Sequence, residues 1–268
     1  MSAPADPAGL VSVVGIGPGD AGTCTSDVVD RIRRATDLVG YAPYLDMVTA
    51  AAGAPLAAAR HASDNRQEAD RAGLALDLAA AGGRVAVVSS GDPGVFAMAA
   101  AVIEQLEADA GAPAPRWAAV EVEVLAGVSA AQAAAARVGA PLGHDFCLIS
   151  LSDNLKPWPV IERRLNAAAG ADFVIALYNP VSRHRPWQLA RAVELLAAHR
   201  APSTPVVVGR DVGRPGGTVR VVPLGELGAA PVDMRTVLIV GSSTTRSFTR
   251  PGGGVAVYTP RSYPGFPG

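Results

Sequence analysis

The stretch Val11-Ser12-Val13-Val14-Gly15-Ile16-Gly17-Pro18-Gly19-Asp20 decides the fold, because an apolar run passes directly into a glycine-rich turn. The same pattern, an apolar run followed by a turn that contains glycine, occurs again at Val85-Ala86-Val87-Val88-Ser89-Ser90-Gly91-Asp92-Pro93-Gly94. Each segment predicts a buried strand that ends in a turn and leads towards a helix. Ligands of open α/β sheets bind at the carboxyl ends of the strands, so we expect both turns at a small-molecule site.

Apolar strands and helical patterns alternate along the rest of the chain, which predicts an α/β fold. We expect helices at 26–35, 64–81, 93–110, 129–138, 159–168 and 187–199, and strands at 120–124, 146–151, 173–178, 205–208, 219–222 and 236–240. The stretch Gly111-Ala112-Pro113-Ala114-Pro115-Arg116 favours neither element and predicts a linker. The expected domains are therefore 1–112 and 113–250, followed by an irregular Gly/Pro-rich tail at 251–268.

Composition narrows the class of protein. The net charge of −1 argues against a nucleic-acid binder, which usually carries a basic stripe. No apolar run reaches the roughly 18 residues of a membrane span, and the N-terminus has no signal-peptide pattern. Cys24 and Cys147 are too few for a disulfide framework or an iron–sulfur cluster, and the four histidines show no metal-ligand spacing. We expect a cytoplasmic enzyme with no metal and no membrane or nucleic-acid partner.

Three motifs resemble the signatures of the tetrapyrrole (corrin/porphyrin) methylases. They are Gly15-Ile16-Gly17-Pro18-Gly19-Asp20, Ser90-Gly91-Asp92-Pro93 and Ala126-Gly127-Val128-Ser129-Ala130, in the expected order. Further segments are similar to the members of this family that methylate ring carbon 17 of a corrin precursor and contract its ring. These segments are 40–45, 139–146, 149–153, 178–183 and 257–261, while the resemblance to the family as a whole covers roughly residues 10–245.

The resemblance implies two α/β domains with mixed sheets flanked by helices, a homodimer, and S-adenosylmethionine bound in a cleft between the domains. The positions that match the family's cofactor contacts are Gly17, Pro18, Ser90, Gly91, Asp92, Val95, Ser129 and Ala130. Asn179 and Asp211 fall near two later contacts, where this chain departs from the commoner side chains.

The implied chemistry needs few catalytic side chains. Methyl transfer from a sulfonium is an in-line displacement, and an electron-rich macrocycle supplies the carbon nucleophile itself. Ring contraction also needs proton transfer, for which we consider His144, Asp145, Asp153, Tyr178 and Asp92. A histidine beside an aspartate suits acid–base work near neutral pH; the alternative is that His144-Asp145 only caps the turn before the strand at Phe146.

The implied substrate is a polycarboxylate, so arginines should bind it. Arg183 and Arg185 are the first candidates because they follow Asn179-Pro180. Arg210 comes second together with Arg214, and the third candidates, Arg60 and Arg66, flank His61.

Three alternatives stay open at this point. Another corrin or uroporphyrinogen C-methyltransferase would carry the same cofactor motifs. An RNA methyltransferase on the same fold should be basic and bind in a salt-sensitive way, whereas this chain is nearly neutral. A non-catalytic corrinoid-binding protein would not need an intact cofactor site.

Overall fold

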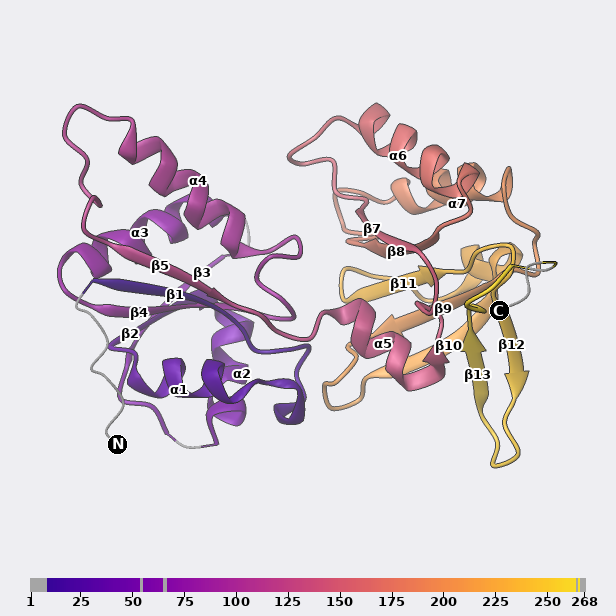
Figure 1. Cartoon of the computed structure of the whole chain (residues 1–268), viewed down its shortest axis with the longest axis horizontal. Coiled ribbons are helices and arrows are strands. Elements are labelled where there is room, and N and C mark those ends of the chain that lie inside the picture. The colour runs from indigo at the N-terminus through magenta and orange to yellow at the C-terminus, as the bar shows by residue number, and fades with distance from the viewer. Residues whose placement is uncertain (1–8, 54, 65–66, 264, 266–268) are drawn as a thin grey trace. The chain divides into compact units, whose positions relative to one another are not determined.

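The computed structural model describes residues 9–53, 55–64, 67–263 and 265, and the chain divides into two compact units, 1–129 and 130–268. Each unit is an α/β layer structure with its own core (Figure 1). No helix within the described ranges has both the length and the apolar character that a bilayer crossing requires.

A parallel five-stranded sheet forms the centre of the first unit. The strands are β1 (Leu10–Gly15), β2 (Asp37–Tyr41), β3 (Ala59–Ser63), β4 (Arg84–Ser89) and β5 (Glu121–Leu125), in the order β3-β2-β4-β1-β5. A short 3₁₀ turn, η1 (Ala21–Thr23), follows β1. Helices α1 (Ser26–Arg34) and α2 (Ala42–Ala52) cover one face, and α3 (Glu68–Ala80) and α4 (Met98–Ala110) cover the other (Figure 1).

Both faces of this sheet are buried, which explains the continuous apolar runs of β1 and β4. Val13 and Val87 pack under α3 and α4, whereas Val14 and Val88 pack against α1 and α2. Successive residues of a strand point to opposite faces, so a strand covered on both sides needs apolar residues at every position.

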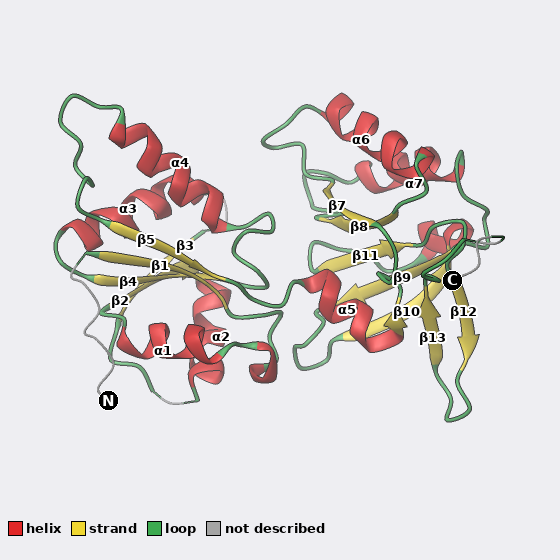
Figure 2. Ribbon diagram, in the orientation of Figure 1, coloured by secondary structure: helices red, strands yellow, loops and turns green. Residues whose placement is uncertain are grey.

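The second unit has a mixed sheet. Its strands are β7 (Phe146–Ser150), β8 (Val174–Tyr178), β9 (Pro205–Arg210), β10 (Thr218–Pro223) and β11 (Thr236–Val240), in the order β10-β9-β11-β8-β7. Only β7 and β8 are parallel neighbours. Helices α6 (Trp158–Gly170) and α7 (Gln188–Ala197) and the 3₁₀ segment η2 (Leu224–Ala229) cover one face, and α5 (Ala130–Val138) covers the other (Figure 2). A small sheet joins β12 (Arg246–Thr249), β13 (Val255–Tyr258) and β6 (Gly139–Ala140).

The predicted fold class, mixed α/β with sheets flanked by helices, is confirmed. The structure divides the chain later than the expected boundary at 112/113, because β5 pairs with β1 and completes the sheet of the first unit. The tail is not irregular throughout, since Val255–Tyr258 forms β13 and pairs with β12 and β6. Helix α4 begins at Met98 and not near Pro93, and β2, β3 and α2 were missed.

Candidate active site

The first two signature turns of the first unit are bonded to each other at the carboxyl ends of β1 and β4. The amide of Gly17 donates to the carbonyl of Gly91 (3.2 Å), and the amide of Gly91 donates to the carbonyl of Gly17 (2.8 Å). Gly17 has φ +70° and Gly91 has φ +74°, a backbone region that favours glycine. The glycines of the two motifs are therefore required by the way the turns meet.

Asp92 joins the second signature to the third. Its Oδ1 accepts from the amide of Gly94 (2.8 Å), and its Oδ2 accepts from the amide of Gly127 (3.0 Å). A Cβ at Gly15 would lie 2.6 Å from the carbonyl oxygen of Gly91 and 2.9 Å from the nitrogen of Gly127. The three turns therefore pack backbone against backbone, with the Asp92 carboxylate as the side chain that links two of them.

The other expected cofactor positions of the first unit lie on the same turns. Pro18 is buried beside Gly17, and the Ser90 hydroxyl lies 3.4 Å from the Gly17 carbonyl. Val95 is half-buried, and its amide donates to the Asp92 carbonyl (3.2 Å). The six expected residues from Gly17 to Val95 are thus brought together at one edge of the sheet.

In the second unit, β7, β8 and β9 run in the same direction, so their carboxyl ends share one edge. The Tyr178 hydroxyl at the end of β8 accepts from the amide of Ala131 in the first turn of α5 (3.0 Å). Asn179 follows with φ 52°, and its Nδ2 donates to the Ser150 hydroxyl (3.0 Å). Ala130, Tyr178 and Asn179 therefore lie at this edge, next to the N-terminus of α5.

Asp211 follows β9 at the same edge and is surrounded by arginines. Its side chain is only 4% exposed and contacts Nε of Arg235 (2.6 Å), NH1 of Arg210 (3.0 Å) and NH1 of Arg214 (3.8 Å). This buried carboxylate holds the loop that leads from β9 to β10. Arg210 is half-exposed and also donates to Oδ2 of Asp233 (2.9 Å), so two carboxylates already engage its guanidinium.

Arg185 was expected to contact the substrate, but the structure buries it against backbone carbonyls. It is 5% exposed, and its NH1 donates to the carbonyls of Asn179 (2.7 Å) and Leu151 (3.3 Å). Burial lowers the pKa of Arg185, although the nearby charge of Asp153 opposes this shift. Arg185 therefore fixes the loops after β7 and β8, while its neighbour Arg183 is exposed.

Asp153 lies in the loop after β7, where its Oδ2 accepts from Nε2 of Gln188 (3.0 Å). Oε1 of Gln188 is buried and has no hydrogen-bond partner among the described residues. The sequence analysis missed Gln188 and Ser150, and Arg235 as well. Ser150 could have been found, because it is a polar residue that ends an apolar strand, as Ser89 does in the first unit.

The structure separates His144 and Asp145 from Tyr178 and Asp153. His144 precedes β7 and so lies at the amino edge of the sheet, one strand of five residues away from the carboxyl edge. At about 3.3 Å per residue, that strand spans roughly 16 Å. Nδ1 of His144 accepts from the amide of Asp145 (2.7 Å), and its ring packs edge-to-face on Tyr263 with 5.2 Å between centroids.

The third pair of candidate arginines does not form a cluster. Arg60 is exposed and forms an ion pair with Asp46 (2.7 Å), and Arg66 lies outside the described residues. Across the described part of the chain, no three His, Cys, Asp or Glu side chains come together in a way that could hold a metal ion.

Comparisons with known proteins agree with this geometry. The family model of the tetrapyrrole (corrin/porphyrin) methylases matches residues 10–228, a range that contains the three signature turns. The chain belongs to this family.

Individual relatives refine the comparison. A precorrin-3B C(17)-methyltransferase from Sinorhizobium is 53% identical over 257 residues, which cover 96% of this chain and 98% of that protein. The cobalamin biosynthesis protein CobIJ of Mycobacterium tuberculosis is 52% identical over 96% of this chain, which spans only 49% of the longer protein. A probable cobalt-factor III C(17)-methyltransferase from Salmonella typhimurium is 42% identical over 95% of this chain and 99% of that protein.

Two solved methyltransferase structures also align with this chain. The crystal structure of the methyltransferase CobJ aligns with a TM-score of 0.84 and 46% identity, and covers 94% of this chain and 100% of that one. A uroporphyrin-III C-methyltransferase from Thermus thermophilus, solved with S-adenosylhomocysteine, aligns with a TM-score of 0.66 over 87% of this chain and 97% of that one. At 22% identity the second structure shows the shared fold alone.

Proposed function

We propose that the chain is an S-adenosylmethionine-dependent C-methyltransferase of cobalamin biosynthesis, which methylates precorrin-3B at ring carbon 17 and contracts the ring to give precorrin-4. The observation that supports this most is the joining of the three signature turns at the carboxyl ends of β1, β4 and β5. The similarity to a precorrin-3B C(17)-methyltransferase over nearly the whole length of both chains supports the choice of substrate.

The residues of the first unit fit such a cofactor. The turns carry glycine, proline and other small residues, so a ligand can lie directly against their backbone. The Ser89 hydroxyl at the end of β4 is buried and has no hydrogen-bond partner among the described residues, which leaves a polar atom next to the second signature. We assign Gly17, Pro18, Ser90, Gly91, Asp92, Val95 and Ser129, together with Ala130, Asn179 and Asp211, to cofactor binding.

The bound cofactor would supply a methyl group on a sulfonium. The side chains of the protein position the reactants and keep water away, effects that contribute up to roughly 7–11 kcal/mol in favourable cases. No strong general base is needed for the transfer itself.

Ring contraction requires a group that moves a proton. We propose Tyr178 and Asp153 for this step, because both lie at the carboxyl edge of β7 and β8. His144 and Asp145 form the second candidate pair. A general acid or base contributes typically 10²–10⁴-fold, so the variant that slows contraction by such a factor identifies the pair.

The direct test is incubation of the purified chain with precorrin-3B and labelled S-adenosylmethionine, followed by product mass and absorbance. We expect a methylated, ring-contracted product. Cobalt-factor III should be tested as a second substrate, since a relative with 42% identity is named a probable cobalt-factor III C(17)-methyltransferase. Turnover of uroporphyrinogen III alone would replace the proposal with a different corrin-pathway methylase.

Two further measurements complete the test. Calorimetry of the metal-free protein with S-adenosylhomocysteine should show binding, and no heat at millimolar ligand would contradict the methylase assignment. Sedimentation tests the homodimer that belongs to this proposal, and salt-dependent RNA binding would favour the RNA methyltransferase instead.

A further inference from the structure

Two loops at the carboxyl edge of the second sheet are fixed to each other, namely the loop that joins β7 to α6 and the loop that joins β8 to α7. Oδ2 of Asp153 in the first loop accepts from Nε2 of Gln188, the first residue of α7 (3.0 Å). The ring of Trp158, the first residue of α6, packs edge-to-face on Trp187 with 4.8 Å between centroids. The β7–α6 loop is therefore attached to the start of α7 at both of its ends.

Two large apolar side chains in this region are exposed to solvent. Leu155 is 90% exposed, and Trp187 is 47% exposed although its ring contacts Trp158. Single exposed apolar residues are common on protein surfaces, so exposure by itself indicates little. Leu155 differs because its loop is fixed two residues earlier, at Asp153, and three residues later, at Trp158. The structure thus presents an apolar side chain to solvent on each of two loops that it holds together.

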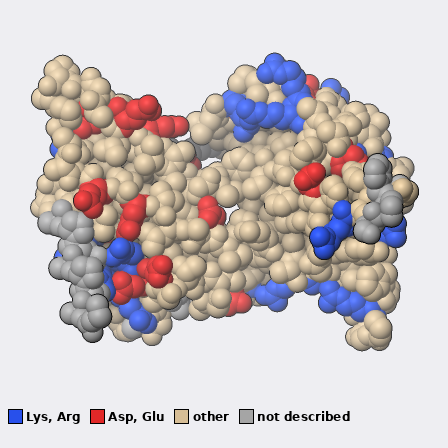
Figure 3. Space-filling view, viewed as in Figure 1, with Lys and Arg blue, Asp and Glu red and all other residues tan. Residues whose placement is uncertain are grey.

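Lys156, the only lysine of the chain, follows Leu155. Lys156 is half-buried and forms no ion pair with a carboxylate of the described residues. Burial lowers the pKa of Lys156, and the positive charge of Arg164 on α6 lowers it further. Figure 3 shows Lys and Arg side chains gathered over α6. Both effects disfavour the ammonium ion, and a carboxylate bound beside it would offset them.

A second cation lies on the loop between β8 and α7. The amide of Ser182 donates to the carbonyl of Arg185 (3.2 Å), and the amide of Arg185 donates to the carbonyl of Ser182 (3.1 Å). Arg183 and His184 therefore form the tip of a tight turn, and both are exposed. Within the described part of the chain, Arg183 has no carboxylate partner. Its guanidinium can present a planar fork of donors to a carboxylate ligand.

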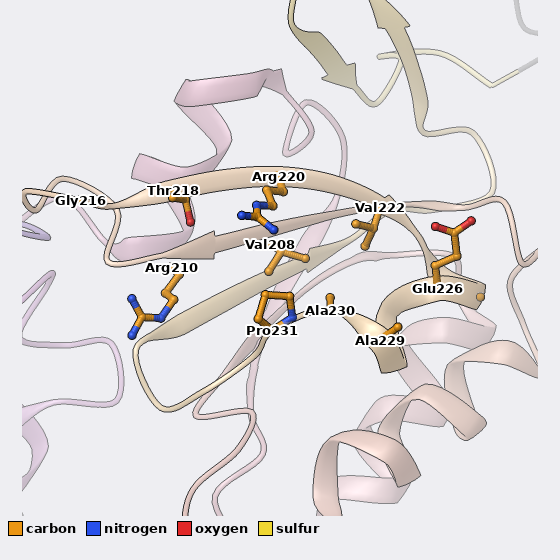
Figure 4. A pocket seen from close by; sticks show the side chains of 11 residues that line it. Val208, Arg210, Gly216, Thr218, Arg220, Val222, Glu226, Ala229, Ala230 and Pro231 are labelled. Atoms are coloured by element: carbon orange, nitrogen blue, oxygen red, sulfur yellow. The ribbon is translucent and has the colours of Figure 1, made fainter.

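A cavity of about 670 Å³ elsewhere in the second unit is less suited to a polycarboxylate. Figure 4 shows Arg210 towards one end of this cavity and Glu226 towards the other, with Arg220 between them. The carboxylate of Glu226 repels an anion, and Arg210 is already engaged by Asp211 and Asp233. The two loops after β7 and β8 therefore fit such a ligand better.

We propose that these two loops hold the tetrapyrrole polyacid on which the enzyme acts. Leu155 and Trp187 contact a face of its macrocycle. Lys156 and Arg183 bind carboxylates at its rim. This inference rests on the proposed function and deepens it, because it names the residues that hold the substrate. The macrocycle has two broad faces and a rim of carboxylates, so it needs apolar or aromatic contacts together with cations. Asp153, one of the groups proposed for proton transfer, lies two residues before Leu155 on the same loop.

The test uses uroporphyrin III, a porphyrin whose side chains are all carboxylates, in a fluorescence titration of the full chain. The variants are Leu155→Ser/Lys156→Gln in one loop and Arg183→Gln in the other. The matched control is Arg246→Gln/Phe248→Ser on β12, which also removes one exposed cation and one exposed apolar side chain (Phe248 is 53% exposed). We expect the double loop variant to weaken porphyrin binding about tenfold or more. Arg183→Gln should weaken it about threefold, and the control should stay within about twofold.

Affinity for S-adenosylhomocysteine, measured by calorimetry on the same samples, separates this inference from the proposed function. Wild-type protein that binds no S-adenosylhomocysteine contradicts the proposed function. Unchanged porphyrin affinity in both loop variants, or equal weakening by the β12 control, overturns the inference.

Two further outcomes test the occupant of the loops. Displacement of the porphyrin by an equimolar linear tetracarboxylate would show that charge alone holds it, which overturns the contact of Leu155 and Trp187 with the macrocycle. A loop variant with an altered sedimentation coefficient would show that a second copy of the chain covers the loops, which overturns the inference as a whole. We expect neither result.

Discussion

Replacement of Asp92 with alanine should separate the second signature turn from the third. The carboxylate accepts one hydrogen bond within its own turn, from Gly94, and one across the turns, from Gly127. Alanine removes both acceptors, and the Gly127 amide then loses its partner in a half-buried place. The backbone after β5 should open more often, and cofactor affinity should fall with it.

The magnitude follows from the two bonds. A hydrogen bond to a charged group contributes about 1.5–3 kcal/mol, and the exposed bond to Gly94 lies at or below the lower end of that range. We therefore expect a loss of about 2–4 kcal/mol in the local stability of the turns. The variant Asp92→Asn keeps one acceptor but turns a donor towards one of the two amides, so it should recover less than half of the loss.

Asp20→Ala is the matched control. Asp20 lies in the first signature, and its Oδ1 accepts from the amide two residues on, Gly22 (3.0 Å), just as Asp92 accepts from Gly94. No cross-turn bond of its side chain is lost in this variant, so the difference between the two variants isolates the bond to Gly127.

The assay is amide hydrogen exchange of peptides that cover 120–131, together with calorimetry of S-adenosylhomocysteine binding. Asp92→Ala should raise the exchange rate of the Gly127 region and weaken binding, whereas Asp20→Ala should leave that region protected. Equal exchange at 126–128 in both variants would refute the idea that Asp92 holds the two turns together.

Three further variants test the second unit. Tyr178→Phe removes the acceptor of the Ala131 amide (3.0 Å) and should cost about 1 kcal/mol in urea unfolding and slow ring contraction; normal contraction would exclude Tyr178 as the proton-transfer group. Arg185→Gln should destabilise the second unit by about 1.5–3 kcal/mol, as followed by Trp158 and Trp187 fluorescence; wild-type stability with weakened substrate binding would show that Arg185 contacts the substrate after all. Burial opposes the charge of Asp172, but hydrogen bonds from Ser243 and the charge of Arg200 outweigh burial and lower the pKa of Asp172. The charged carboxylate therefore stabilises the fold fully above the unfolded pKa of about 3.9, and this stabilisation is lost as the pH falls through the lower native pKa. Asp172→Asn should therefore lower the melting temperature at pH 7 and approach the wild type in acid; a difference that persists at pH 2 would contradict this.

The position of the signature turns could be predicted because their cause is local. An apolar run followed by glycines ends a strand and turns the chain, and strand ends are where ligands bind. The link from Asp92 to Gly127 could not be predicted, since it depends on the placement of β5 beside β1. The same placement explains why the domain boundary was expected too early.

The candidate acid–base residues show a second reason why parts of the site could not be predicted from the sequence. His144 and Asp145 were grouped with Asp153 and Tyr178 on residue type, although the residues before a strand and those after it lie at opposite edges of a sheet. Arg185 was expected at the substrate because a polycarboxylate needs arginines and Arg185 follows Asn179-Pro180, but here its guanidinium donates to the carbonyls of Leu151 and Asn179. Its burial does not follow from local sequence, since the loops after β7 and β8 meet around it only in the folded unit.

The two units hold the carboxyl edges of their sheets by different means. In the first unit, glycine backbone packs on glycine backbone, so shape and backbone polar groups define the edge. In the second unit, guanidinium groups define it: three of them enclose the Asp211 carboxylate, and Arg185 holds the loops after β7 and β8. Electrostatic attraction at exposed arginines is screened by salt, whereas backbone packing is not. Rising ionic strength should therefore weaken the binding of a polyacid to the second unit far more than it weakens the binding of a cofactor to the turns of the first.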